Sequence, residues 1–246
     1  MKKTIFAIVI ATILLIQGCG TDEGTSKTSV MLPLYIYPTH WEEDENLTAL
    51  IEATDGEFVA IISPSKDEKS DSYVAGIDYL YGKNVKMIDY ITTDYGERDE
   101  QEIYDQIDEY VDFYGTEKVS GIFFDEVSLK TTEEEAYMKD ISDYAKSKNL
   151  NFIAINPGTT IDQDIFDEKY YDIVLTREGS YTKYSTLTNT VLSSTKTKQS
   201  LVVYECPDLS SYTSEIQKAK DQGYNYIYFT IAPETDRYST VFNFLR

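Results

Sequence analysis

The chain has 246 residues and a formal net charge of −21 at pH 7, because 43 Asp and Glu residues outnumber 22 Lys and Arg residues. This balance disfavours nucleic acid as a partner, since its phosphates would be repelled and the sequence contains no basic stripe. The charge is sufficient to keep the protein soluble, and it would also attract a cationic partner such as a polymer with free amino groups.

The first 29 residues are typical of an export signal followed by a tether. Lys2 and Lys3 precede an apolar run over residues 5–16, which is shorter than the roughly 20 residues that span a bilayer. The ending Ile-Gln-Gly-Cys resembles the lipobox of bacterial lipoproteins, in which the cysteine becomes diacylated. A plain secretory signal with an incidental cysteine is the alternative.

We therefore expect residues 1–18 to be a signal peptide and Cys19 to carry the lipid. Residues 19–29 then form the lipidated cysteine and a short polar tether. This arrangement predicts an exported protein, anchored in the outer face of the bacterial cytoplasmic membrane or extracellular.

Residues 30–246 form one predicted domain with eight short apolar runs that are rich in β-forming residues. Several runs are hydrophobic almost throughout, as strands covered on both faces are. The runs lie at residues 30–37, 58–63, 85–91, 121–127, 151–156, 172–176, 200–205 and 224–231.

The segments between the runs have helical patterns where periodicity can be tested. Thr132 and Glu135 have the spacing of a capping box, and Gly223 follows the helical segment 211–222 in the usual position past a helix. Apolar residues at steps of four, three and four share one face of a third segment: Ile103, Ile107, Tyr110 and Tyr114.

Eight alternations of strand and helix predict parallel βαβ units and a single-domain (β/α)8 TIM-type barrel. A doubly wound open sheet is the alternative architecture. It has less support, because no Gly-rich phosphate loop follows any strand.

Active sites of such barrels lie at the carboxyl ends of the strands, so the polar residues that end each run are the candidates. Asp125 and Glu126 directly follow the apolar Gly121–Phe124, where charges would be half buried. Glu178 follows the sixth run. Candidates for substrate contact follow other runs: Tyr35, Tyr37, His40, Trp41, Tyr95, Arg98, Asn156 and Glu205. Cleavage of a glycosidic bond requires two carboxyl groups, and aromatic faces are suitable platforms for sugar rings.

Other chemistries have few candidate residues. His40 is the only histidine, which weakens both a Ser-His-Asp triad and a multi-histidine zinc site. No stretch has EF-hand spacing. With Cys19 acylated, Cys206 lacks a disulfide partner, and we expect it to be a buried strand residue. We expect no cofactor and no metal ion.

The motif from Gly121 to Val127 resembles the spherulin-4 family. Further motifs match in family order, at residues 33–38, 60–64, 73–77, 95–98, 156–159 and 178–181. The resemblance implies a (β/α)8 barrel that acts as an endo-hydrolase on α-1,4-linked galactosamine or N-acetylgalactosamine polymers of biofilm matrix, with retention of configuration.

By the same resemblance, Asp125 is the catalytic nucleophile, Glu178 is the acid/base, and Glu126 orients or tunes Asp125. The chain departs from the family pattern at Thr92, where a histidine often stands, and this leaves the fine substrate preference open. We expect Glu178 to lie in drier or more negative surroundings than Asp125, with Asp125 held ionised by neighbours such as Asn156.

Two other functions stay open at this point. A non-catalytic carbohydrate-binding surface lipoprotein could use the same barrel as a receptor, and a different glycosidase could use it for another sugar. We favour cleavage of an aminosugar-containing polysaccharide, because both carboxyl groups of the proposed pair are present.

Overall fold

The computed structural model describes residues 27–65, 67–158, 161–167, 170–186, 192, 194 and 196–246. The expected signal peptide, Cys19 and most of the tether therefore lie outside the described residues. Within the described ranges, no helix combines the length and apolar character needed to cross a bilayer.

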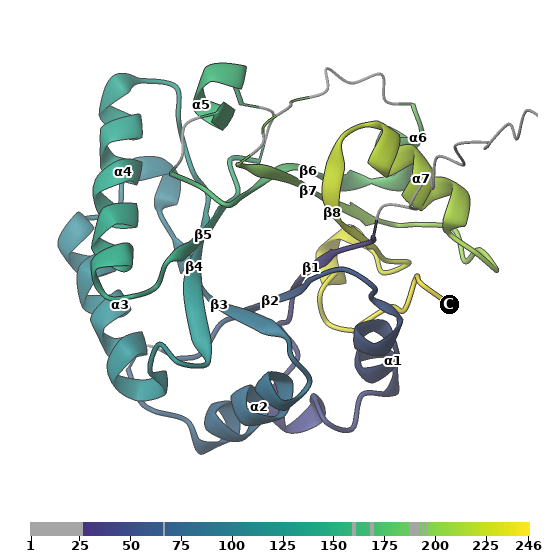
Figure 1. The fold of residues 1–246 in the computed structure, drawn as a ribbon, viewed down its shortest axis with the longest axis horizontal. Coiled ribbons are helices and arrows are strands. Elements are labelled where there is room, and N and C mark those ends of the chain that lie inside the picture. Colours follow the sequence, from purple (N-terminus) through teal and green to yellow (C-terminus); the bar gives the residue numbers. More distant parts are fainter. Residues whose placement is uncertain are drawn as a thin grey trace, which may run out of the picture.

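The fold is a barrel of parallel strands surrounded by helices (Figure 1). The eight strands form one sheet in sequence order, and each strand pairs in parallel with the next. The first and last strands meet through a parallel bridge between Ser29 and Tyr226, where Ile227 N donates a 3.0 Å hydrogen bond to Ser29 O. The predicted (β/α)8 barrel is confirmed, and the open sheet is excluded.

The strands are β1 Val30–Pro33, β2 Phe58–Ile62, β3 Lys86–Thr92, β4 Val119–Asp125, β5 Phe152–Ile155, β6 Ile173–Ser180, β7 Lys198–Tyr204 and β8 Tyr224–Phe229. The α-helices are α1 Glu45–Ala53, α2 Asp71–Gly82, α3 Glu100–Tyr114, α4 Thr132–Ser147, α5 Gln163–Asp167, α6 Tyr181–Ser185 and α7 Thr213–Asp221. Three 3₁₀ turns follow strands: η1 Pro38–His40 after β1, η2 Asp94–Gly96 after β3 and η3 Glu234–Asp236 after β8.

Two strand boundaries differ from prediction in ways that affect the site. β1 ends at Pro33, so Tyr35 and Tyr37 lie on the loop beyond it. β6 continues to Ser180, because its last residues pair with β7 through a register shift after Leu175. Glu178 is therefore held within a strand, which fixes its backbone more firmly than a loop would.

The helix predictions hold with one correction. Ile103, Ile107 and Tyr110 are buried on one face of α3, and Gly223 follows α7 with a positive φ of 86°. The capping box of α4, however, is formed by Thr131 and Glu134, one residue earlier than expected. Thr131 has the extended backbone that an N-cap requires, whereas Thr132 is already the first helical residue.

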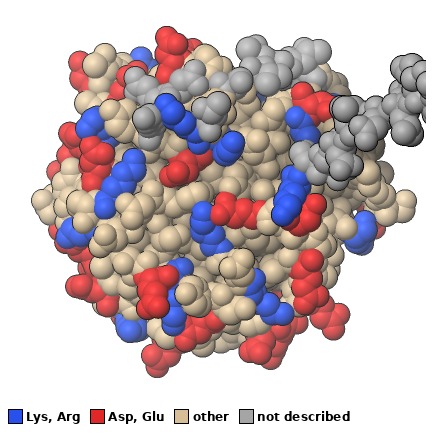
Figure 2. All heavy atoms as spheres, viewed as in Figure 1, with Lys and Arg blue, Asp and Glu red and all other residues tan. Residues whose placement is uncertain are grey.

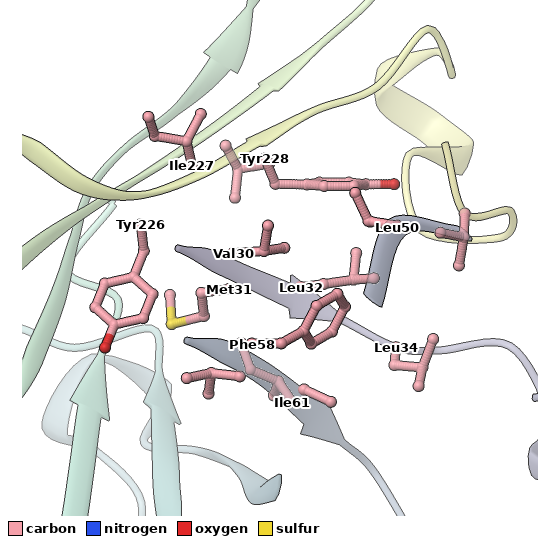
Figure 3. Close-up of a cluster of buried hydrophobic side chains, with 14 of the residues drawn as sticks. Val30, Met31, Leu32, Leu34, Leu50, Phe58, Ile61, Tyr226, Ile227 and Tyr228 are labelled. Carbon is pink, nitrogen blue, oxygen red and sulfur yellow. The ribbon is translucent and has the colours of Figure 1, made fainter. Parts of the chain in front are cut away.

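The barrel core explains the unbroken hydrophobic runs. Met31 and Leu32 of β1 are at most 1 % exposed, although their side chains point to opposite faces of the sheet. Phe58 of β2 and Tyr226 and Tyr228 of β8 surround them (Figure 3). A strand covered both by the barrel interior and by the helices needs apolar residues at every position.

Gly121 sets how closely β4, the strand that ends in Asp125, approaches β5. A Cβ at this position would overlap the carbonyl oxygen and side chain of Phe152 in β5. Only glycine allows β4 and β5 to lie this close, and their pairing places Asp125 beside the end of β5.

Candidate active site

A cavity of about 620 Å³ lies at the carboxyl ends of the strands. Its walls come from strand ends around the barrel and from the segment that follows β8. The strand ends contribute Tyr35, Tyr90, Asp125, Asn156 and Glu178, and the segment after β8 contributes residues 234–239.

Asp125 ends β4 and accepts hydrogen bonds on both carboxylate oxygens. Tyr90 Oη donates to Oδ2 at 2.9 Å, while Asn156 Nδ2 and the backbone N of Glu126 each donate to Oδ1 at 2.9 Å. Burial raises the pKa of Asp125, the three donors partly offset this effect, and the negative charge of Glu178 adds to the rise. The expected hydrogen bond from Asn156 is present.

Glu178 projects into the same cavity and contacts a cation. Arg237 Nε lies 2.5 Å from Oε1, and Tyr238 Oη donates to the same oxygen at 2.8 Å. Of the expected drier or more negative surroundings of Glu178, the second part is wrong, because a guanidinium touches the carboxylate.

The Asn156 amide joins the two carboxylates. Its Nδ2 lies 2.9 Å from Asp125 Oδ1 and 3.3 Å from Glu178 Oε2, so these two oxygens are at most about 6.2 Å apart. The amide orientation is fixed on its other side, where Asn156 Oδ1 accepts a 2.9 Å bond from Gly158 N.

Glu126 does not line the cavity. Its backbone is left-handed, with φ 54°, and its carboxylate turns toward β3, where Thr92 Oγ1 donates to it at 2.5 Å. Its carbonyl oxygen accepts bonds from Tyr95 N at 2.7 Å and Thr93 Oγ1 at 2.8 Å. Glu126 can therefore position Asp125 through its backbone N–H while its side chain anchors the turn.

Tyr35 and Tyr37 are the exposed aromatic residues near the cavity that the sequence identified. Tyr35 is 42 % exposed, lines the cavity, and makes edge contacts with Tyr90 and Tyr238 at centroid distances of 5.8 and 5.5 Å. Tyr37 is 55 % exposed and lies just outside the lining, against the ring of Tyr73, which does line the cavity.

Trp41 does not reach the cavity, contrary to the prediction from the sequence. It is fully buried, its Nε1 donates a 2.8 Å bond to Ile36 O, and its ring packs on Tyr73 and on α2 at Gly76. Trp41 follows η1 and packs on Tyr73, which lines the cavity. Trp41 therefore supports the cavity wall from behind and cannot touch a sugar.

Four other expected contacts also lie outside the cavity lining. Arg98 is bonded to Thr92 O at 3.1 Å and to Gln106 Oε1 at 2.7 Å, which makes it a brace between β3 and α3. His40, Tyr95 and Glu205 are exposed and do not line the cavity. Residues that end a strand share the same end of the barrel, but each turn decides where they point.

Three residues in direct contact with the acid pair were missed from the sequence. Tyr90 has a detectable signal, since it alternates with Thr92 along β3 and should share its face. Arg237 and Tyr238 lie beyond the last predicted strand, in a stretch without periodicity. Their position, just past the end of a barrel strand, is the only indication of their role.

The charge pattern of the surface and the arrangement of possible metal ligands both bear on what the protein can bind. Positive and negative side chains are interleaved on the face shown in Figure 2, so no single-sign stripe crosses it. Over the residues with described positions, no group of three or more His, Cys, Asp or Glu residues is arranged to hold a metal ion.

Comparison with known proteins agrees with this architecture. The model of the spherulation-specific family 4 matches residues 29–245. Spherulin-4 of Physarum polycephalum is 32 % identical over 150 residues, which cover 58 % of this chain and 43 % of that protein. The chain thus matches less than half the length of this relative.

A solved structure is similar over nearly the whole barrel. Aspergillus clavatus Sph3, crystallised in complex with GalNAc, superposes with a TM-score of 0.73 over 89 % of this chain and 94 % of its own, at 23 % identity. At this level of identity the likeness supports the fold.

Proposed function

The chain belongs to the spherulation-specific family 4, and from that premise we propose that it is a glycoside hydrolase that cleaves an aminosugar-containing polysaccharide with retention of configuration. The observation that carries the proposal is the pair of carboxylates, Asp125 and Glu178, which face one cavity and are joined by a single amide nitrogen of Asn156. Cleavage of a glycosidic bond requires two such carboxyl groups.

In the first step, protonated Glu178 gives its proton to the glycosidic oxygen while an oxygen of Asp125 bonds to the anomeric carbon. The leaving sugar departs as an alcohol. In the second step, ionised Glu178 takes a proton from water, the water oxygen attacks the anomeric carbon, and Asp125 is released. The three hydrogen bonds to Asp125 hold it in place for attack.

The substrate class is proposed to be a polymer of galactosamine, N-acetylgalactosamine or both, and the reaction an endo-cleavage. Sph3 was crystallised with GalNAc. In this chain, the cavity combines tyrosine rings, of which that of Tyr35 is exposed, with several carboxylates, a lining suited to a sugar that carries an amino group. The formal charge of −21 favours a cationic, partly deacetylated polymer over a neutral one.

We place the enzyme outside the cell, held by lipid on Cys19, where it would meet matrix polysaccharide. The support is the sequence of the first 19 residues, with its basic start, short apolar run and Gly-Cys ending.

The test is to incubate purified residues 27–246 with a panel of matrix polysaccharides that includes galactosamine polymers of known acetylation. Released oligosaccharides are identified by mass spectrometry, and the anomer of the first product is identified by proton NMR. Products with the parent configuration support the proposal. Binding without products from any polymer would favour the receptor function, and products from a different polysaccharide would favour a different glycosidase.

A further inference from the structure

The position of Arg237 conflicts with the proposed role of Glu178 as the catalytic acid. The Arg237 Nε lies 2.5 Å from Glu178 Oε1, so the two side chains form an ion pair. The first step of the reaction, in contrast, needs Glu178 to carry a proton. Both facts can hold if the guanidinium moves during the cycle.

The surroundings of Arg237 allow such a movement. Its Nη1 donates a 2.7 Å bond to Glu234 O, and its guanidinium lies over the rings of Tyr204 and Tyr238 at 5.6 and 5.1 Å. The Arg237 side chain is 33 % exposed, so it is not locked in the core. The Glu234 carboxylate, which accepts a 2.9 Å bond from Tyr204 Oη, lies on the same turn and offers a second anionic partner.

We propose that Arg237 is a movable counter-ion that pairs with Glu178 in the empty site, withdraws along the Tyr204 ring toward Glu234 when a sugar enters, and returns for the second step. This inference rests on the proposed function. Withdrawal lets Glu178 take a proton from solvent, which it then gives to the glycosidic oxygen. Return stabilises the carboxylate that must take a proton from the attacking water. Arg237 is thus a positioning residue that acts through Glu178.

Among the ionisable groups around Glu178, Arg237 is the cation whose position can change. Asp125 faces Glu178 from β4, and Glu234 and Asp236 line the same cavity on the turn before Arg237. The other neighbours are tyrosines from four parts of the chain: Tyr35, Tyr90, Tyr204 and Tyr238. Burial raises the pKa of each tyrosine, that of Tyr204 to about 12, so all four stay neutral through the working range. Within this set Asp125, Glu234 and Asp236 are the anions, and Arg237 is the cation.

The experiment compares pH profiles of kcat/KM on a galactosamine polymer that the wild type cleaves. In Arg237→Gln, the alkaline limb should move to higher pH, because protonated Glu178 no longer requires a guanidinium to withdraw. Arg237→Lys keeps a positive charge and should restore most of the wild-type limb. Arg246→Gln is the matched control, because it removes a charge from the same C-terminal segment, where Arg246 pairs with Asp208.

A second variant tests the alternative partner. Glu234→Gln weakens the position to which Arg237 withdraws, so the alkaline limb should move in the opposite direction, to lower pH. An active wild type with the same alkaline limb in Arg237→Gln, or the same limb in Glu234→Gln, overturns the movable counter-ion. A wild type that cleaves no polymer overturns the proposed function instead, so the two failures can be told apart.

Discussion

Tyr90 Oη donates a 2.9 Å hydrogen bond to Oδ2 of Asp125, whereas Asn156 and the backbone N of Glu126 donate to Oδ1. The ring of Tyr90 stacks on Phe123, its partner across β3 and β4, which lies two residues before Asp125. The hydroxyl is therefore held in place by packing, and its contribution can be isolated by removing one atom.

Tyr90→Phe should lower kcat/KM near neutrality by about 10- to 100-fold, the usual range for a hydrogen bond to a charged group. Losing a donor to the ionised form raises the pKa of Asp125 further, so the acid limb of the pH profile should move to higher pH. Tyr81→Phe, at an exposed tyrosine on α2, is the control. An unchanged acid limb in Tyr90→Phe would show that this bond does not act on the nucleophile.

Neutralising Asp125 and neutralising Glu178 should reduce activity in ways that can be distinguished. Asp125→Asn and Glu178→Gln should each reduce polymer cleavage by at least about 10³-fold while circular dichroism shows an intact fold. An aryl glycoside with a good leaving group should partly rescue Glu178→Gln, because protonation is then dispensable, but it should not rescue Asp125→Asn. Near-normal polymer turnover by either variant would contradict the assignment.

Asp89 should make stability depend on pH. It is 1 % exposed in β3, and its Oδ1 has no hydrogen-bond partner. Burial raises its pKa well above the usual range, so the folded protein holds a proton that the unfolded chain releases. Stability is thus full below the unfolded pKa of about 3.9 and is lost as pH rises through the folded pKa.

Asp89→Asn removes this loss. The thermal midpoint of the variant should be a few degrees higher at pH 7, at about 2–4 °C per kcal/mol for a domain of this size, and the gain should disappear at pH 4. Asp112→Asn, at an exposed position on α3, should show neither effect. A gain that is the same at both pH values would rule out ionisation as its cause.

Gly121→Ala should destabilise the barrel by about 3 kcal/mol or more, because its Cβ would overlap the Phe152 carbonyl and push β4 from β5. Urea unfolding gives the free energy, and activity should fall with it because Asp125 ends the same strand. Gly82→Ala is the matched control, since no atom lies within 4 Å of its Cβ position. Equal stability of the two variants would refute the close approach of β4 and β5.

Cys19→Ala in the full chain should abolish membrane retention of the processed protein, because it removes the thiol that would carry the lipid. Cell fractionation and labelling with a radioactive fatty acid measure the result. The variant should be found in the medium or remain unprocessed. A processed, membrane-bound Cys19→Ala protein would contradict lipidation at this residue.

The sequence by itself determined the barrel and the carboxylate pair. Strands buried on both faces must be apolar at every position, so the eight strands stand out without any knowledge of their neighbours. A charge directly after Phe124 marks the end of β4, and the rule that barrel sites lie at strand ends then places Asp125 and Glu178 together.

Only the tertiary structure decided which side chains reach that pair. Arg237 is 59 residues from Glu178 along the chain, and they meet because the segment after β8 lines the same cavity. Trp41 and Glu126 were both predicted to lie in the site. Trp41 is instead buried after η1, and a left-handed backbone turns Glu126 toward Thr92. Periodicity fixes which face of a regular element is buried, whereas the direction of a loop depends on contacts between residues far apart in sequence.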